Sequence, residues 1–210
     1  MTPNKPIIGV TGNSGSGKGT VCAILKGLGG FYLDTDHIAH TVMEYGKPAY
    51  TEISNMFGDG ILLRDKSIDR KKLGDIVFRD PAKRKALERI VHTQVKLICG
   101  QLTRAALHNA EYAFIVWDAP LLAEAGMHKE CSLVLLVTAP FAFKVSRIMN
   151  RDCITEERAL LRLSNQPPDN ILYKGLVDDL GTSHVKIIEN SGSIQDLEYK
   201  TRMAVRPLGD

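Results

Sequence analysis

A glycine-rich run near the start of the chain is the clearest candidate for chemistry. It reads Gly12-Asn-Ser-Gly-Ser-Gly-Lys-Gly-Thr20 and fits the pattern G-x-x-x-x-G-K. Glycines let consecutive backbone N–H groups approach phosphate oxygens, and a following helix would point its positive end at the same anion. Lys18 adds a charge for the β- and γ-phosphates. The run predicts a phosphate-binding loop with nucleotide contacts from Asn13, Ser14, Gly15, Ser16, Gly17, Lys18, Gly19 and Thr20.

The metal ligands of such a loop are less clear. A Ser or Thr usually follows the lysine and places its hydroxyl on Mg²⁺, but Gly19 stands there and Thr20 offers the nearest hydroxyl. Asp118, at the end of a predicted strand, is a second candidate ligand, acting through water, or else a cap of the next turn. We expect Mg²⁺ at Thr20 and Asp118.

Two carboxylates follow the second predicted strand, where open α/β sheets place ligand groups. Asp34 and Asp36 could each act as the base that accepts a proton from an attacking hydroxyl, or as the cap of the next helix. We expect Asp34 to be the base and Asp36 the cap.

The elements that position these residues alternate between short apolar strands and helix-patterned segments. Such alternation, with few hairpin signals, predicts an α/β fold with a parallel sheet covered on both faces. We predict helices at 18–28 and 80–108, and strands at 6–11, 31–33, 112–117, 132–137 and 185–188.

Composition excludes several classes of protein. The 210 residues carry a net charge of only +3, which argues against nucleic acid as a partner, and no window is long and apolar enough to span a membrane. The four cysteines form no metal-binding or disulfide pattern, so we expect a cytoplasmic protein. A guanine-nucleotide switch is disfavoured because the one N-K pair, Asn4-Lys5, precedes the first strand. A small-molecule kinase and a nucleotide-gated binding module remain.

Six sequence elements resemble the dephospho-coenzyme A kinase family over nearly the whole chain. They are T-G-N-S-G-S-G-K at 11–18, L-D-T-D-H-I-A-H at 33–40, D-R-K-K-L-G-D-I-V-F at 69–78, L-E-R-I-V-H at 87–92, A-P-L-L-A-E at 119–124 and R-L-S-N-Q at 162–166. Their order and spacing are far more specific than the glycine-rich run alone. Another P-loop kinase for a small metabolite or nucleotide is the alternative.

The resemblance implies transfer of the ATP γ-phosphate to the ribose 3′-hydroxyl of dephospho-CoA, although the residues leave ATP and GTP undistinguished. It implies a P-loop three-layer fold: a five-stranded parallel sheet flanked by helices, with a helical CoA-binding insertion and a lid. We expect one domain with its core at 6–35, 112–145 and 185–206, an acceptor-binding helical part at about 36–110, a lid at about 147–170, and a monomer or weak homo-oligomer.

The resemblance also assigns site residues. Asp34, Lys18 and Arg151 would be catalytic, and Arg151 and Asn190 would bind the nucleotide. His92 matches an H-P element of the family, although Thr93 replaces its proline and alters the expected loop. The implied contacts to the acceptor are Asp34, His92, Pro120, Leu121, Leu122, Glu124 and Arg162.

Four arginines lie in the expected lid, two on each side of a helix cap at Thr155. They could close over the phosphates and stabilise transition-state charge, or lie on solvated helix faces. We expect a functional role for Arg151 and Arg162 and leave both interpretations open for Arg147 and Arg158.

Overall fold

The computed structural model describes residues 5–206, which form two compact units. The first unit holds the described residues up to Leu33 and from Thr103 onward, and the second is Asp34–Leu102. The strands are β1 (Ile7–Thr11), β2 (Gly30–Asp34), β3 (Phe114–Asp118), β4 (Leu133–Thr138) and β5 (Val185–Glu189). The α-helices are α1 (Lys18–Gly27), α2 (Thr35–Val42), α3 (Pro48–Phe57), α4 (Arg70–Arg79), α5 (Pro81–Leu107), α6 (Phe141–Asp152), α7 (Glu156–Ser164), α8 (Asp169–Leu180) and α9 (Ile194–Val205). Short 3₁₀ turns are η1 (Asp59–Ile61), η2 (Met127–Glu130) and η3 (Thr182–His184).

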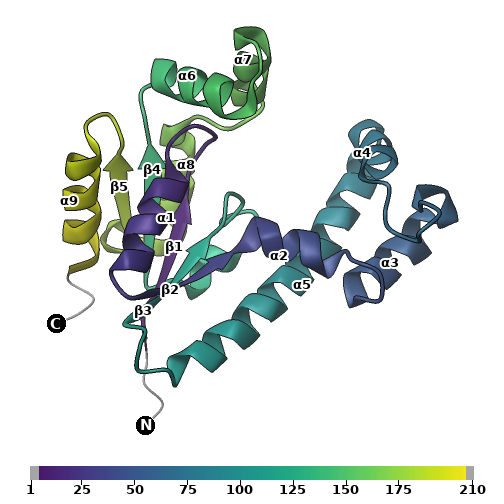
Figure 1. The fold of residues 1–210 in the computed structure, drawn as a ribbon, viewed down its shortest axis with the longest axis horizontal. Coiled ribbons are helices and arrows are strands. Elements are labelled where there is room, and N and C mark those ends of the chain that lie inside the picture. The colour runs from purple at the N-terminus through teal and green to yellow at the C-terminus, as the bar shows by residue number, and fades with distance from the viewer. Residues whose placement is uncertain (1–4, 207–210) are drawn as a thin grey trace. The chain divides into compact units, whose positions relative to one another are not determined.

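The first unit is built on one five-stranded sheet with the order β2-β3-β1-β4-β5 (Figure 1). β1 runs parallel to both β3 and β4, and β4 runs parallel to β5. The predicted parallel α/β sheet is confirmed, and each predicted strand overlaps an observed one. Because parallel strands end at the same edge, the segments that follow β1, β3 and β4 all begin on one side of the unit.

One face of the sheet is covered by α1 and α9, which pack against each other (Figure 1). Side chains alternate across a strand, so Ile8 and Val10 of β1 face these helices together with every second residue of the neighbouring strands. The buried cluster on this face is Ile8, Val10, Val21, Cys22, Leu25, Phe114, Val116, Leu133, Leu135, Val137, Ile188, Leu197 and Ala204.

The opposite face of β1 is covered by the segment that follows β3. A Cβ added to Gly9 would lie 2.6 Å from Leu122 Cδ2 and 2.8 Å from Cys131 Sγ, so this segment packs directly on the strand backbone. Burial raises the pKa of the Cys131 thiol to about 12. α8 packs against both β5 and η2, which completes the layer.

The helices α6 and α7, in the region expected to form a lid, pack on each other through a small apolar cluster of Val145, Ile148, Ala159 and Leu163. Thr155 lies at the predicted N-cap position of α7, but its side chain makes no capping hydrogen bond; Glu156 and Glu157 occupy the first turn. This arrangement suits the helix dipole.

The second unit is helical. Asp34 caps α2, and Asp69 caps α4 by accepting from the N–H groups of Lys71 and Lys72. Its apolar residues include Tyr50, Ile53 and Ile61, which are buried. Among residues 5–206, none of the helices combines the length and apolar character needed to cross a bilayer.

Candidate active site at the phosphate loop

The phosphate loop (residues 12–20) joins β1 to α1 in the first unit, as the sequence predicted. Gly15 and Gly17 adopt φ values of +76° and +97°, which L-residues rarely take. A Cβ on Gly15 would come within 2.5 Å of the Lys144 carbonyl oxygen. Ser16 is fully buried, and within residues 5–206 its hydroxyl has no hydrogen-bond partner. The loop therefore has the tight glycine turns that phosphate binding needs, and it holds a buried hydroxyl that a ligand could use.

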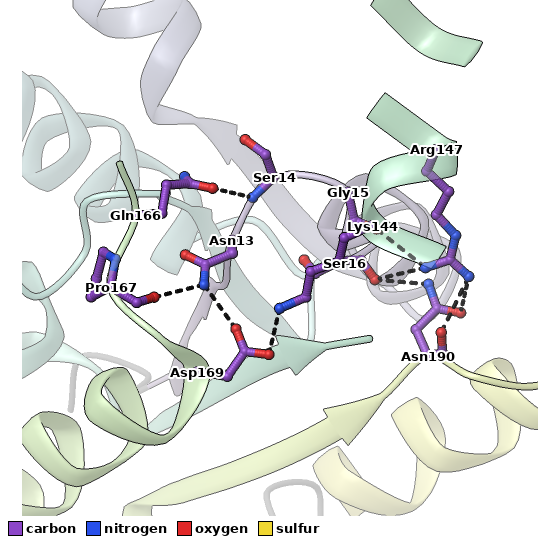
Figure 2. Close-up of polar contacts among 10 residues, drawn as sticks. All are labelled: Asn13, Ser14, Gly15, Ser16, Lys144, Arg147, Gln166, Pro167, Asp169 and Asn190. Carbon is purple, nitrogen blue, oxygen red and sulfur yellow. Dashed lines mark hydrogen bonds and ion pairs between the residues drawn. The ribbon is translucent and has the colours of Figure 1, made fainter. Parts of the chain in front are cut away.

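Lys144 and Arg147 of α6 lie against the loop. The Arg147 guanidinium donates to the Gly15 carbonyl at 3.2 Å and the Ser16 carbonyl at 3.3 Å (Figure 2). It also donates to the backbone and side-chain oxygens of Asn190 at 3.2 and 3.3 Å. The Asn190 amide in turn donates to the Ser16 carbonyl at 2.9 Å. These contacts occupy the carbonyls of Gly15 and Ser16. Arg147 therefore fixes the phosphate loop, a role that the sequence left open.

The start of the loop is held by residues that follow α7. Gln166 Oε1 accepts from the Ser14 N–H at 3.0 Å, and Asn13 Nδ2 donates to the Pro167 carbonyl and to Asp169 Oδ1, both at 2.8 Å (Figure 2). The second Asp169 oxygen pairs with Lys144 Nζ at 2.5 Å. Apart from Asn13 and Ser14, these residues were not predicted as site residues, although Gln166 is the last residue of the R-L-S-N-Q element.

The loop lysine faces a carboxylate from the neighbouring strand. Lys18 Nζ lies 3.7 Å from Asp118 Oδ1, and Asp118 Oδ2 accepts from the Tyr32 hydroxyl at 3.1 Å. Both charged side chains are largely shielded, with 18% and 13% of their surfaces exposed. Asp118 therefore lies where it can orient the lysine, and a metal ion held there would be close to the same phosphates.

The predicted metal ligands differ in their surroundings. Thr20 and Gly19 are exposed at the start of α1, and a Cβ on Gly19 would meet no heavy atom within 4 Å. In the described part of the chain no cluster of three or more His, Cys, Asp or Glu side chains could hold a metal by itself. One carboxylate beside a phosphate site fits Mg²⁺, which typically keeps several waters and takes one or two carboxylates plus substrate phosphates.

The predicted roles of the two aspartates after β2 need one correction. Asp34, not Asp36, is the N-cap of α2, because its Oδ1 accepts from the His37 N–H at 2.9 Å. Asp36 lies in the first turn and is exposed. The helix begins two residues earlier than the cap prediction required. Capping uses one of the two carboxylate oxygens of Asp34. The role of Asp34 as a base stays a prediction.

The predicted acceptor contacts fall in two places. His92 and Thr93 lie inside α5, where Thr93 Oγ1 donates to the Arg89 carbonyl at 2.7 Å, so the loop expected at this point is a helix. Pro120 follows β3, and its carbonyl accepts from the Thr11 hydroxyl at 3.1 Å. Of the next residues, Leu121 and Glu124 are exposed, whereas Leu122 is fully buried over Gly9 and supports the segment from within the core.

The predicted lid arginines pair with an aspartate. Arg151 donates to both oxygens of Asp152, at 2.7 and 2.9 Å, and Arg162 donates to one of them. The hydrogen bonds and charge of Arg151, and then the hydrogen bond and charge of Arg162, lower the pKa of Asp152 to about 2. Both arginines are about half exposed. Arg158 is exposed on α7.

Comparison with known proteins identifies the family of this chain. The dephospho-CoA kinase family model covers residues 6–195. A dephospho-CoA kinase from Bacillus licheniformis is 36% identical over 91% of both chains, and one from Moorella thermoacetica is 42% identical over 76% of both. A Thermus thermophilus crystal structure superposes with a TM-score of 0.77 at 33% identity, covering 99% of this chain and 100% of that one. A dephospho-CoA kinase from Campylobacter jejuni gives 0.64 at 27% identity over 97% and 96%. The chain belongs to the dephospho-CoA kinase family.

Proposed function

We propose that this chain transfers the γ-phosphate of ATP to the ribose 3′-hydroxyl of dephospho-CoA, giving CoA and ADP. The observation that carries the proposal is the family match over residues 6–195. The phosphate loop with Lys18 beside Asp118 supports it, because a phosphoryl-transfer enzyme works chiefly by positioning and charge stabilisation.

In the proposed reaction the N–H groups of the phosphate loop and the Lys18 ammonium bind the β- and γ-phosphates. Asp34 accepts the proton of the 3′-hydroxyl, whose oxygen forms a bond to the γ-phosphorus. The bond from that phosphorus to the β–γ bridging oxygen breaks, and ADP leaves. Arg151 and Arg162 are proposed to stabilise the charge of the transferred group, exchanging part of their pairing with Asp152 for phosphate oxygens.

Mg²⁺ is proposed as the metal cofactor, with Asp118 as the carboxylate that holds it through water and Thr20 as a further candidate. The ion would neutralise phosphate charge. On the acceptor side we propose contacts from His92, Pro120, Leu121 and Glu124, with Leu122 supporting that segment. The second unit would hold the acceptor, and Asn190 would lie near the adenine.

We also propose that the protein acts in the cytoplasm as a monomer or weak homo-oligomer. Four free cysteines, three of them buried, fit a reducing compartment.

The activity is tested by incubating the protein with ATP, Mg²⁺ and dephospho-CoA and detecting CoA by mass spectrometry. Formation of CoA that depends on all three components is the expected result. Absence of CoA together with turnover of another hydroxyl compound would identify a different small-metabolite kinase. ATP binding without acceptor-dependent turnover would favour a nucleotide-gated module.

The role of Asp34 is tested separately by Asp34→Asn. Asn caps helices about as well as Asp, so the variant should keep α2 and its folding while losing the base. We expect turnover to fall by about 10²- to 10⁴-fold, the usual contribution of a general base, with ATP affinity unchanged. Asp36→Asn is the matched control and should stay near wild type. An Asp34→Asn variant as fast as wild type would refute the assignment.

A further inference from the structure

The segment at residues 166–169, which leads out of the lid, is joined to the first residues of the phosphate loop by a continuous polar network (Figure 2). The contacts cross 152 to 156 positions in the sequence. They are therefore tertiary contacts, separate from the local turns of either segment.

Asn13 and Asp169 each make two contacts in this network. Asn13 donates both N–H groups of its amide, one to the Pro167 carbonyl and one to Asp169. Asp169 uses one oxygen for Asn13 and the other for Lys144. Asn13 is 8% exposed and Lys144 only 6%, so each needs its partners, since buried polar groups and charges are costly when left unpaired.

Gln166 is the member of this network that touches the loop backbone. Its side-chain carbonyl accepts from the Ser14 N–H at 3.0 Å. A glutamine makes this bond without charge. A glutamate in its place would set a negative charge within hydrogen-bond distance of a loop whose ligand is itself a polyanion. A glutamine therefore suits a position where a hydrogen-bond acceptor must lie close to bound phosphates.

Both ends of the lid thus attach to the same loop. Lys144 and Arg147 lie on α6, near the start of the expected lid at about 147–170, and Gln166 and Asp169 lie near its end. Arg147 holds the carbonyls of Gly15 and Ser16, whereas the segment after α7 holds Asn13 and Ser14.

From these contacts we propose that Gln166 is a positioning residue for phosphoryl transfer. It holds the Ser14 N–H, and through it the phosphate loop, in the conformation that receives the triphosphate. Asp169 anchors the same segment, so lid and loop become ordered together. The proposal rests on the ATP-dependent function proposed above, and it adds a residue that acts through the loop backbone.

The experiment compares Gln166→Met, which removes the acceptor at similar size, with Gln166→Glu, which keeps an acceptor and adds charge. Asn170→Ala, an exposed position in the first turn of α8, is the control. The probe is inorganic tripolyphosphate, titrated by calorimetry, because it reports on the phosphate loop without the adenine or acceptor sites. Steady-state KM values for ATP and dephospho-CoA and hydrogen exchange of a peptide covering residues 11–20 complete the readout.

For Gln166→Met we expect the Kd of tripolyphosphate and the KM of ATP to rise about 2- to 12-fold, the range for loss of one neutral hydrogen bond. Hydrogen exchange at residues 11–20 should accelerate, and the KM of dephospho-CoA should not change. Gln166→Glu should bind tripolyphosphate more weakly than wild type without that acceleration. Added salt should narrow the difference in affinity between this variant and wild type, because salt screens the added repulsion. The control should match wild type.

The proposal is overturned if Gln166→Met melts like wild type and binds tripolyphosphate equally well. It is also overturned if KM rises equally for ATP and dephospho-CoA, since that result indicates general damage. Wild type that binds tripolyphosphate but makes no CoA would refute the proposed function and leave the Gln166 contact to be judged by the binding data. Wild type that binds neither tripolyphosphate nor ATP would refute both.

Discussion

Replacing Gly17 by alanine tests whether the phosphate loop depends on the contact between Gly17 and Asn190. The Gly17 backbone has φ of +97°, and a Cβ built there lies 2.0 Å from Asn190 Nδ2. The asparagine side chain would have to move. That movement breaks its bond to the Ser16 carbonyl, at 2.9 Å, and the bond that it accepts from Arg147, at 3.3 Å.

Two contributions set the expected magnitude. An L-residue in the left-handed region costs about 1–2 kcal/mol. Each lost hydrogen bond adds about 0.5–1.5 kcal/mol, so the pair adds about 1–3 kcal/mol. Gly17→Ala should therefore lower the free energy of unfolding by about 2–5 kcal/mol, a large part of the ordinary stability of a domain. ATP binding should weaken as well, because the displaced groups fix the loop carbonyls.

The assay is urea unfolding together with ATP titration, for Gly17→Ala, Asn190→Ala and the double variant. Gly19→Ala is the matched control, because its Cβ would meet nothing within 4 Å and its φ is ordinary. In the Asn190→Ala background the new Cβ has room, and Gly17→Ala should then cost only the backbone contribution of about 1–2 kcal/mol. The coupling free energy between the two sites should be about 1–3 kcal/mol.

Equal stability and ATP affinity for Gly17→Ala and Gly19→Ala would refute the reasoning about this turn. A Gly17→Ala effect that is unchanged when Asn190 is already alanine would show that the steric contact is irrelevant and that only the backbone conformation matters.

Three further predictions use other parts of the first unit. Gly19→Ser should place a hydroxyl where the common motif has one. We expect it to lower the Mg²⁺ concentration that gives half-maximal rate, without loss of stability. An unchanged Mg²⁺ titration would argue against a metal ligand at this position. Cys153 is exposed, whereas the other three cysteines are buried, and burial raises the pKa of Cys131 to about 12. A thiol reagent at neutral pH should therefore modify Cys153 alone in the native protein, which peptide mapping would show. The depressed pKa of Asp152, about 2, means that its pairing stabilises the fold above the unfolded-state pKa of about 3.9 and is lost as pH falls toward 2. The stability difference between wild type and Asp152→Asn should therefore be constant near neutral pH and shrink between about pH 4 and 2; a difference that grows on acidification would contradict this sign.

The sheet and the phosphate loop could be predicted from the sequence because their signals are local. A β-branched apolar run, a glycine turn with a lysine and a helical repeat follow one another within residues 6–28. The carboxyl ends of parallel strands meet at one edge, so the position of Asp118 near Lys18 also follows from the strand pattern.

The residues that hold the loop could not be predicted in the same way. Arg147 and Arg151 lie one turn apart on α6, and only the packing of that helix decides that Arg147 reaches the loop while Arg151 meets Asp152. Which aspartate caps α2 depends on the residue at which the helix begins, and helix ends are the part of a structure that sequence patterns define least sharply. Leu122 lies in a family motif, yet it can pack on β1 only because Gly9 has no side chain.

The contact between Asn190 and the Ser16 carbonyl joins residues 174 positions apart. β1 likewise lies between strands that are synthesised more than 100 residues later, with Val10 opposite Asp118 and Leu135. A chain emerging from the ribosome therefore carries its glycine-rich loop long before the strands and side chains that shape it exist. Contacts of such long range slow folding, because a large loop must close before they stabilise anything. The contacts of Asn190 that hold the loop can consequently form only after synthesis has passed this residue.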